Sequence, residues 1–434
     1  MSARQDRWGD GAAIERERVR RGDGSGRSAS VDRSHTSTLV NPVALKRDAH
    51  DPDYIIMVAV LALSAIGILM VYSASAIDSY RNSQNTFQLV APQVMAGLLG
   101  IAAMIFLMRL DYRYLRVVSV PLAFVALGML AIVLLPGIGI SHAGSSRWLY
   151  LGPLPDIHPA EVAKLALAVY LAHWLATRGG EIKSFWRGTV PYWAIVAPFL
   201  LLVIREPDLG TAGVIVLLAF SLYFVAGANL FHIMVAGVGA CCAAAVVVLA
   251  MRGYPLERIQ TLLDPWAHPL TTGYHTIQGL EAITAGGWFG TGLGNDKVFV
   301  PASVNDFIFS VICQELGLAG GAVVIFLFVA FAYAGIRTAL RAPDTFGGLM
   351  AAGITAWICF QALINIGVVV AVVPVTGITL PFVSAGGSSL TVTLAAVGIL
   401  LSVSRETVER GWVSATADSG RGYGGTYIPG SRRS

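Results

Sequence analysis

The sequence predicts an all-α polytopic membrane protein with ten transmembrane helices. The chain is 55% hydrophobic and 13% charged, whereas an ordinary soluble domain is about 25% charged. Of its 56 Asp, Glu, Lys and Arg residues, 27 lie in segments 1–53 and 405–434, so the central part is poorer still in charge. Ten stretches of that central part reach the roughly 20 apolar residues that span a bilayer.

These stretches are apolar on all sides rather than alternating with a period of two, which predicts helices and not an outer-membrane barrel. The four cysteines fall inside them and are predicted to be small buried residues, not a disulfide or metal framework. The stretches begin near Tyr54, Gln88, Val117, Pro159, Thr189, Leu209, His232, Phe307, Gly347 and Ala385.

Basic residues predict the orientation of the helices. An even number of spans places both tails on one side, and that side collects ten Lys and Arg from the N-terminal tail and five from the C-terminal tail. We therefore expect a disordered cytoplasmic tail over 1–52, a membrane domain over 53–404 and a second cytoplasmic tail over 405–434. The only long polar loop, 252–306 between spans seven and eight, is then extracytoplasmic.

Asp306 stands where this loop meets the eighth span, which begins Phe307-Ile308-Phe309. Charges at membrane depth are costly and tend to be functional. A carboxylate at the water–membrane boundary is partly desolvated yet still reaches an aqueous substrate, which suits a general base. Within the loop, 255–263 and 274–284 have the pattern of short amphipathic helices that lie on the outer membrane surface.

Two further groups of polar residues face outward. Arg147 precedes a helix start that carries Glu161 and Lys164, whose i, i+3 spacing allows an ion pair. This pair has two interpretations, a structural lock or a lining of the substrate cavity. Asp208 lies in a tight turn between two spans, where capping of the next helix is the favoured interpretation.

Two prolines and three glycines interrupt the apolar segment 373–389, and irregular backbone at membrane depth needs protein or a water-filled cavity around it. The segment includes Ser384 and ends in Gly386, Gly387, Ser388 and Ser389. The last four open a helix, whose free N–H groups and hydroxyls could hold an anion such as pyrophosphate. A plain helix start with serine capping is the alternative that spacing alone favours.

The chain resembles the SEDS family, the FtsW/RodA/SpoVE group of bacterial peptidoglycan polymerases, from about Asp53 to Arg405. Pro153 and the segment Pro159–Leu167 are more similar to the division branch, FtsW, than to the elongation branch, RodA. Ten motifs occur in the family's order: Met70–Ser75, Ser146-Arg147-Trp148, Pro159-Ala160-Glu161 with Lys164, Pro207–Ala212, Asp264-Pro265-Trp266, Gly292-Leu293-Gly294, Asp306–Phe309, Gln314–Gly317, Asn365-Ile366-Gly367 and Leu380–Ser389 without Ala385.

The resemblance implies glycan-strand polymerisation from lipid II on the outer face of the bacterial cytoplasmic membrane, in cell division or elongation. It also implies a class B penicillin-binding transpeptidase and other division or elongation proteins as partners, and no nucleic acid. Four positions depart from the family's pattern. Ala302, Val304 and Ala385 replace a Glu, a His and a common Tyr, and Glu206 replaces the usual Gln.

Polymerisation needs a base for the acceptor hydroxyl and cations or N–H groups for the departing pyrophosphate. Asp306 is the one well-placed base candidate in the sequence, and Arg147, Arg205, Arg258 and Lys297 are the outward cations. A divalent metal, Mg²⁺ or Mn²⁺, could also stabilise the departing pyrophosphate, although the sequence identifies no ligands for it. Inversion at an α-linked sugar needs one base rather than a carboxylate pair.

Two other functions remain open at this stage. Broken helices and an intramembrane Glu–Lys pair also suit a transporter or lipid flippase. A transporter, however, binds its substrate near the midplane, whereas most polar residues of this chain gather at one surface. A non-catalytic scaffold for a division complex is the third possibility, in which Asp306 would be dispensable.

Overall fold

The computed structural model describes residues 50–83, 90–135, 139–142, 145–149, 156–250, 254–295, 298, 300 and 304–407. The two predicted tails lie outside these residues except at 50–52 and 405–407. The helices are α1 (Tyr54–Ser83), α2 (Val90–Arg109), α3 (Tyr114–Val133), α4 (Pro159–Arg178), α5 (Val190–Arg205), α6 (Leu209–Val225), α7 (Leu230–Ala250), α8 (Tyr254–Leu263), α9 (Tyr274–Gly286), α10 (Ile308–Arg341), α11 (Thr345–Val369) and α12 (Gly387–Ser404).

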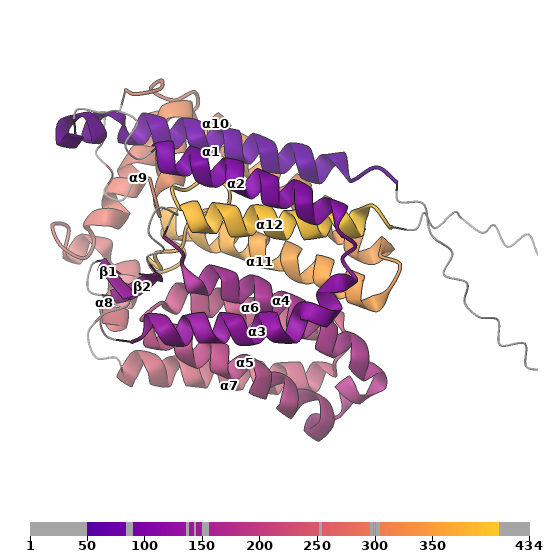
Figure 1. The fold of residues 1–434 in the computed structure, drawn as a ribbon. Helices are drawn as coiled ribbons and strands as arrows, with labels where there is room; N and C mark the ends of the chain where they lie inside the picture. Colours follow the sequence, from indigo (N-terminus) through magenta and orange to yellow (C-terminus); the bar gives the residue numbers. More distant parts are fainter. Residues whose placement is uncertain are drawn as a thin grey trace, which may run out of the picture. The chain divides into compact units, whose positions relative to one another are not determined.

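Each of the ten predicted apolar stretches forms a helix, from α1 to α7 and from α10 to α12 (Figure 1). Within the described residues, seven segments are long and apolar enough to cross a membrane, and α6 and α7 contain two shorter apolar ones. The chain is therefore a multi-pass membrane protein. The remaining one of these ten helices, α4, is mostly buried and carries the predicted ion pair.

The two predicted loop helices are confirmed as α8 and α9, and Gly287 ends α9 with a positive φ of 56°. An all-helical chain was expected, and this expectation is wrong in one place. Residues Gly139–His142 (β1) and Ser145–Leu149 (β2) pair as an antiparallel hairpin. Such a short ladder has no hydrophobic alternation long enough to be visible in the sequence.

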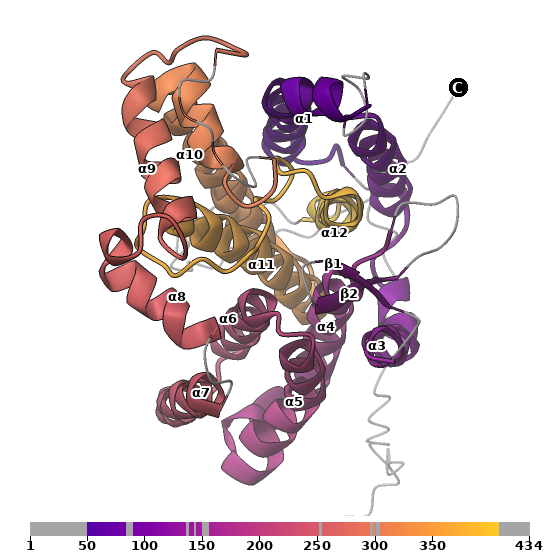
Figure 2. The same ribbon diagram turned by 90° about the vertical axis from the view of Figure 1, so that its left-hand side faces the viewer.

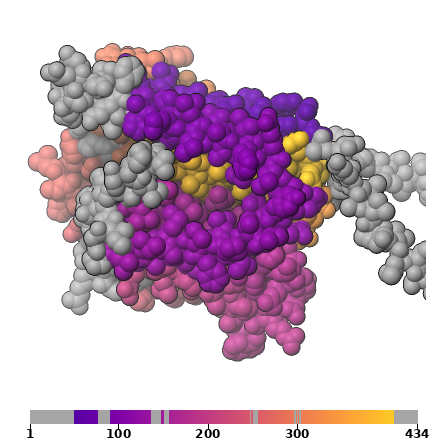
Figure 3. Space-filling view, in the orientation of Figure 1, coloured from indigo at the N-terminus to yellow at the C-terminus, as the bar shows by residue number. Residues whose placement is uncertain are grey.

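Helix α12 is the centre of the arrangement, because it contacts α1, α2, α4, α10 and α11. Seen end-on, α12 lies among these helices, while α8, α9 and the hairpin gather at one end (Figure 2). In the space-filling view only part of α12, in yellow, shows between the neighbouring helices (Figure 3). Its apolar sequence is explained by this burial on nearly every side.

The ends of the described chain meet at the opposite end of the bundle. The His50 imidazole lies 3.0 Å from the Thr407 hydroxyl, and Arg337 of α10 pairs with Asp53 at 2.5 Å. The two ends of the helical part therefore lie at the same end of the bundle.

The prediction that all four cysteines are buried is wrong for two of them. Cys313 is buried and Cys359 is half-buried, but Cys241 and Cys242 are exposed on α7. This helix packs on the outside of α6 and contacts few other elements. Its apolar surface is explained by a lipid environment rather than by a protein core. All four thiols are free.

Close packing of α12 on α2 yields a stability prediction. A Cβ added at Gly398 of α12 would lie 2.8 Å from the Met104 Cα of α2, which real Cβ atoms do not tolerate. Overpacking costs typically about 1–3 kcal/mol, so Gly398→Leu should lower the thermal unfolding temperature in detergent. Gly128→Leu is the matched control, because no heavy atom lies within 4 Å of its added Cβ. Equal unfolding temperatures for the two variants would contradict the packing.

Candidate functional site

Asp306 lies in the turn that leads into α10, and its backbone is fixed by α11. The Asn365 side chain donates one hydrogen bond to the Asp306 carbonyl at 2.8 Å and another to the Ile378 carbonyl at 2.7 Å. Ser384 adds a second attachment, since its hydroxyl donates to the Asn305 carbonyl at 2.6 Å. The irregular segment 370–386, which connects α11 to α12, is thereby tied to the turn that carries Asp306.

Two arginines from separate elements act on the Asp306 carboxylate. Burial raises the pKa of Asp306 to about 6, whereas Arg258 of α8 lowers it, Asp208 raises it and Arg147 of β2 lowers it. Arg258 also donates a hydrogen bond to the Val375 carbonyl. The structure therefore brings together four residues that are 48 or more positions apart along the chain.

Arg147 is held by the turn between α5 and α6. Its Nε donates to the Glu206 carbonyl at 3.0 Å and its Nη2 to the Pro207 carbonyl at 2.6 Å. Both partners are neutral, so the guanidinium charge is not cancelled by these bonds. Arg147 is thus a positioned cation beside the carboxylates.

Asp208 caps α6 as predicted, because its Oδ1 accepts a hydrogen bond from the Thr211 N–H at 3.0 Å. Its Oδ2 lies 3.9 Å from His158 Nε2. Burial lowers the pKa of His158, with Asp208 and Glu161 opposing the shift, so the imidazole is neutral at pH 7. The cluster therefore extends from Asp306 through Asp208 to the start of α4.

The start of α12 joins the same cluster. The His158 N–H donates to the Ser388 hydroxyl at 3.2 Å, and the Ser389 hydroxyl lies 3.3 Å from that of Thr379. The Gly386 N–H donates to the Gln93 side chain at 3.1 Å. Gly387 is the first residue of the helix. This end of α12 presents its dipole and N–H groups toward the side of the bundle that holds Asp208.

The predicted Glu161–Lys164 ion pair is confirmed, with 2.8 Å between Oε1 and Nζ. Lys164 is fully buried, and its ammonium also donates to Gln361 at 2.6 Å and lies 5.2 Å from the Trp357 ring. Gln361 in turn donates to the Thr379 carbonyl at 3.1 Å. The pair thereby supports the irregular segment that Asn365 also holds.

Two further cations were predicted from the sequence. Lys297 lies outside the described residues, and Arg205 is exposed at the end of α5. The structure places three buried residues in or beside the site to which sequence reasoning assigned no site role, namely Glu206, Gln361 and Asn365. In the sequence, Glu206 is noted only as a departure from the family's pattern and Asn365 only as part of a family motif. The spacing of Gln361 and Asn365, four residues apart on one face of an apolar helix, was the available signal for two of them.

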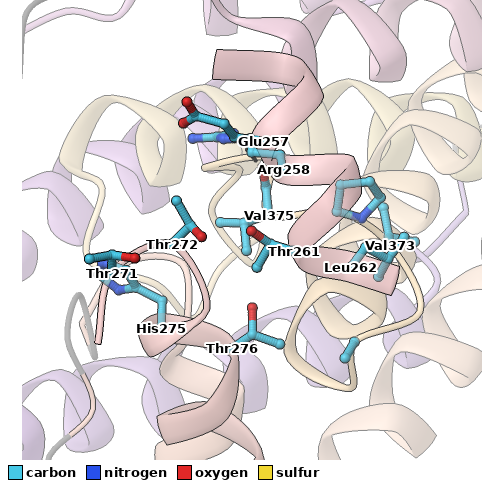
Figure 4. Close-up of a pocket in the computed structure, with 12 residues that line it drawn as sticks. Glu257, Arg258, Thr261, Leu262, Thr271, Thr272, His275, Thr276, Val373 and Val375 are labelled. Carbon is cyan, nitrogen blue, oxygen red and sulfur yellow. Dashed lines mark hydrogen bonds between the residues drawn. The ribbon is translucent and has the colours of Figure 1, made fainter. Parts of the chain in front are cut away.

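A cavity of about 280 Å³ opens beside Arg258, between α8, α9 and the segment after α11 (Figure 4). Threonine hydroxyls and apolar side chains share its walls, and the figure shows Thr261, Thr272 and Thr276 around the same space. The lining residues are Glu257, Arg258, Thr261, Leu262, Thr271, Thr272, His275, Thr276, Ala371, Val373, Pro374 and Val375.

Metal binding by protein groups alone does not fit the described part of the chain. No three His, Cys, Asp or Glu side chains come together there in an arrangement that holds an ion. The carboxylates of the site face arginines and a neutral histidine instead.

Comparison with known proteins gives a consistent family. The family model described as "Cell cycle protein", FTSW_RODA_SPOVE, matches residues 54–409. The chain is 41% identical to stage V sporulation protein E of Bacillus subtilis, over 82% of this chain and 97% of that protein. It is 39% identical to the probable peptidoglycan glycosyltransferase FtsW of Geobacter metallireducens, over 81% and 94%.

Solved structures agree. A chain from a peptidoglycan synthase complex, described as coordinating polymerization and crosslinking, matches with a TM-score of 0.69 and 30% identity, covering 82% of this chain and 98% of that one. The rod shape determining protein RodA of Thermus thermophilus matches with a TM-score of 0.61 and 29% identity, over 82% and 97%.

The buried ion pair yields the second prediction. Removing one partner of a buried pair leaves the other uncompensated and costs about 3–5 kcal/mol. Lys164→Met or Glu161→Gln alone should therefore lower the unfolding temperature more than the double variant does. Strictly additive losses in this cycle would contradict the pairing. A double variant that folds but makes no product would assign the pair to the substrate cavity, and an active one would exclude that role.

Proposed function

The chain belongs to the FtsW/RodA/SpoVE family and is a peptidoglycan glycosyltransferase, and we propose that it polymerises lipid II with Asp306 as the general base. The observation that carries the assignment is a half-buried carboxylate under the influence of two arginines at the start of an apolar helix. With a pKa of about 6, this carboxylate is ionised at pH 7 and yet basic enough to accept a proton in the transition state.

The reaction follows from these groups. The Asp306 carboxylate takes the proton of the acceptor sugar hydroxyl while the oxygen forms a bond to the anomeric carbon of the donor. The bond between that carbon and the pyrophosphate oxygen breaks, and the electron pair leaves with the pyrophosphate. Arg147 and Arg258 stabilise the departing anion, as preorganised charges do in a poorly solvated site. One base is sufficient for inversion.

The start of α12 is proposed to add N–H donors for the same anion. A helix N-terminus attracts phosphate through its unpaired N–H groups and its dipole. Ser388 and Ser389 are buried there, and Ser388 touches the backbone of His158 beside Asp208. Ser384 belongs to the support of Asp306 rather than to this anion site, because its hydroxyl is used by the Asn305 carbonyl and the Leu380 N–H.

We place the sugars of the substrate against the threonine-lined cavity. Arg258 lines this cavity and also acts on Asp306, so a sugar bound there lies beside the base. Its mixture of hydroxyls and apolar walls suits a carbohydrate, which presents both kinds of surface.

The setting of the reaction is also part of the proposal. All ten helices cross the bacterial cytoplasmic membrane, both tails are cytoplasmic, and Asp306 faces outward. A class B penicillin-binding transpeptidase and other division or elongation proteins are the proposed partners. The similarity to a chain of a peptidoglycan synthase complex supports such a partner. A divalent cation carried by the substrate's pyrophosphate, rather than by a protein cage, is compatible with the donors described.

A lipid-precursor flippase is the second candidate, and the buried Glu161–Lys164 pair is the observation that favours it. Against it, the two arginines that act on Asp306 come from β2 and α8, and these elements lie at one end of the bundle (Figure 2). A non-catalytic scaffold would not need this cluster of charged residues around Asp306.

The third prediction concerns the base. Asp306→Asn keeps the size and the backbone contacts of Asp306 but removes its basicity, and a positioned base contributes about 10²–10⁴-fold. Glycan synthesis from lipid II should fall by that factor while unfolding temperature and membrane insertion remain unchanged. The protonated form of Asp306 cannot act as a base, and its pKa is raised to about 6. The rate of the parent protein should therefore fall roughly tenfold for each pH unit below that value. Parent-like synthesis by the Asn variant would refute the assignment.

The fourth prediction separates polymerase from flippase. In proteoliposomes with the cognate transpeptidase present, lipid II supplied to the outer leaflet alone should be converted to glycan chains. Asp306→Asn serves as the matched control and should abolish the polymer without changing lipid movement between leaflets. Protein-dependent translocation without any polymer would favour the flippase. Full polymerisation by a complex that contains the Asn variant would favour the scaffold.

A further inference from the structure

Glu206 places a deeply buried carboxyl group between the end of α5 and the start of α6. It ends α5 with 1% of its surface exposed. Neither side-chain oxygen has a hydrogen-bond partner among the residues that the structure describes. The backbone of the same residue is fully used, because its carbonyl accepts from Arg147 and its N–H donates to the Leu202 and Val203 carbonyls.

Two charged groups from other elements face this carboxyl group, Asp208 at the start of α6 and Arg147 on β2. An ionised carboxylate that is buried without donors is strongly disfavoured. Burial, followed by the charge of Asp208, raises the pKa of Glu206 to about 8, and Arg147 offsets only part of the shift. Glu206 is therefore a neutral carboxylic acid at pH 7.

We propose that Glu206 is a proton-holding positioning residue, which keeps Arg147 available for the departing pyrophosphate only while its own carboxyl group is protonated. The inference rests on the proposed function, because it concerns the charge of the same site. Glu206 does not touch the reacting atoms. It acts through Arg147, whose Nε and Nη2 are directed at two carbonyls rather than at a carboxylate.

The charges around Asp306 show why the proton matters. With Glu206 neutral, the negative charges of Asp306 and Asp208 are balanced by those of Arg147 and Arg258. Ionisation of Glu206 adds a second carboxylate next to Asp208 and gives Arg147 a charged partner in place of carbonyl oxygens. An anionic leaving group would then meet a site of net negative charge and a cation already paired.

Glu206→Gln tests the proposal, since glutamine has the same shape and is neutral at every pH. The rate of glycan synthesis from lipid II and the KM are measured from about pH 6.5 to about pH 9.5. The parent should lose about ninety per cent of its rate one unit above the pKa of Glu206, whereas the Gln variant should keep its rate. Glu281→Gln, an exposed carboxylate on α9, is the matched control and should behave as the parent does.

A binding measurement keeps the test independent of turnover. Inhibition by inorganic pyrophosphate should weaken with rising pH in the parent and less so in Glu206→Gln. An identical alkaline decline in parent and Gln variant, or a Gln variant that folds but is inactive at every pH, would overturn the proposal. If that variant does not fold, an absence of alkaline decline in the parent overturns it. A parent without polymer at any pH refutes the proposed function instead.

Discussion

The site depends on one requirement, that the irregular backbone between α11 and α12 finds hydrogen-bond partners inside the bundle. At membrane depth water does not satisfy such groups, so each unpaired carbonyl or N–H is costly. Asn365 and Gln361 meet this requirement with bonds to the Asp306, Ile378 and Thr379 carbonyls. Because Asn365 serves both the segment and the turn before α10, the same two bonds that stabilise the backbone also fix the position of Asp306.

The electrostatics of the cluster impose a compromise on the arginines. Burial raises the pKa of Asp306, Arg258 and Arg147 oppose that shift, and the resulting pKa is about 6. Cations that bind the carboxylate too tightly would make it a weak base and would have no charge left for pyrophosphate. Arg147 instead donates hydrogen bonds to two backbone carbonyls, which hold it in place without neutralising it, and Arg258 donates one to the Val375 carbonyl.

Much of this fold follows from the sequence, because ten apolar stretches of spanning length leave the backbone few alternatives to a helix. Local chemistry also fixed the Asp208 cap and the Glu161–Lys164 pair, whose partners are three positions apart. The β1–β2 hairpin and the isolation of Glu206 were not visible, since both depend on elements distant in the chain. The exposed Cys241 shows that an apolar sequence context does not imply burial inside the protein.

A transporter would use the Glu161–Lys164 ion pair to bind its substrate, but in this chain the pair is part of a hydrogen-bond network that supports the backbone. The Lys164 ammonium donates hydrogen bonds to Glu161 and Gln361, and the Gln361 side chain donates one to the Thr379 carbonyl. A ligand that bound Lys164 in the bundle would have to break this network and release the segment that holds Asp306. A reaction at the end of the bundle that holds α8 and the hairpin makes no such demand, because Arg147, Arg258 and the start of α12 already lie beside Asp208 and Asp306. The arrangement therefore favours group transfer at one end of the bundle over passage of a substrate through it.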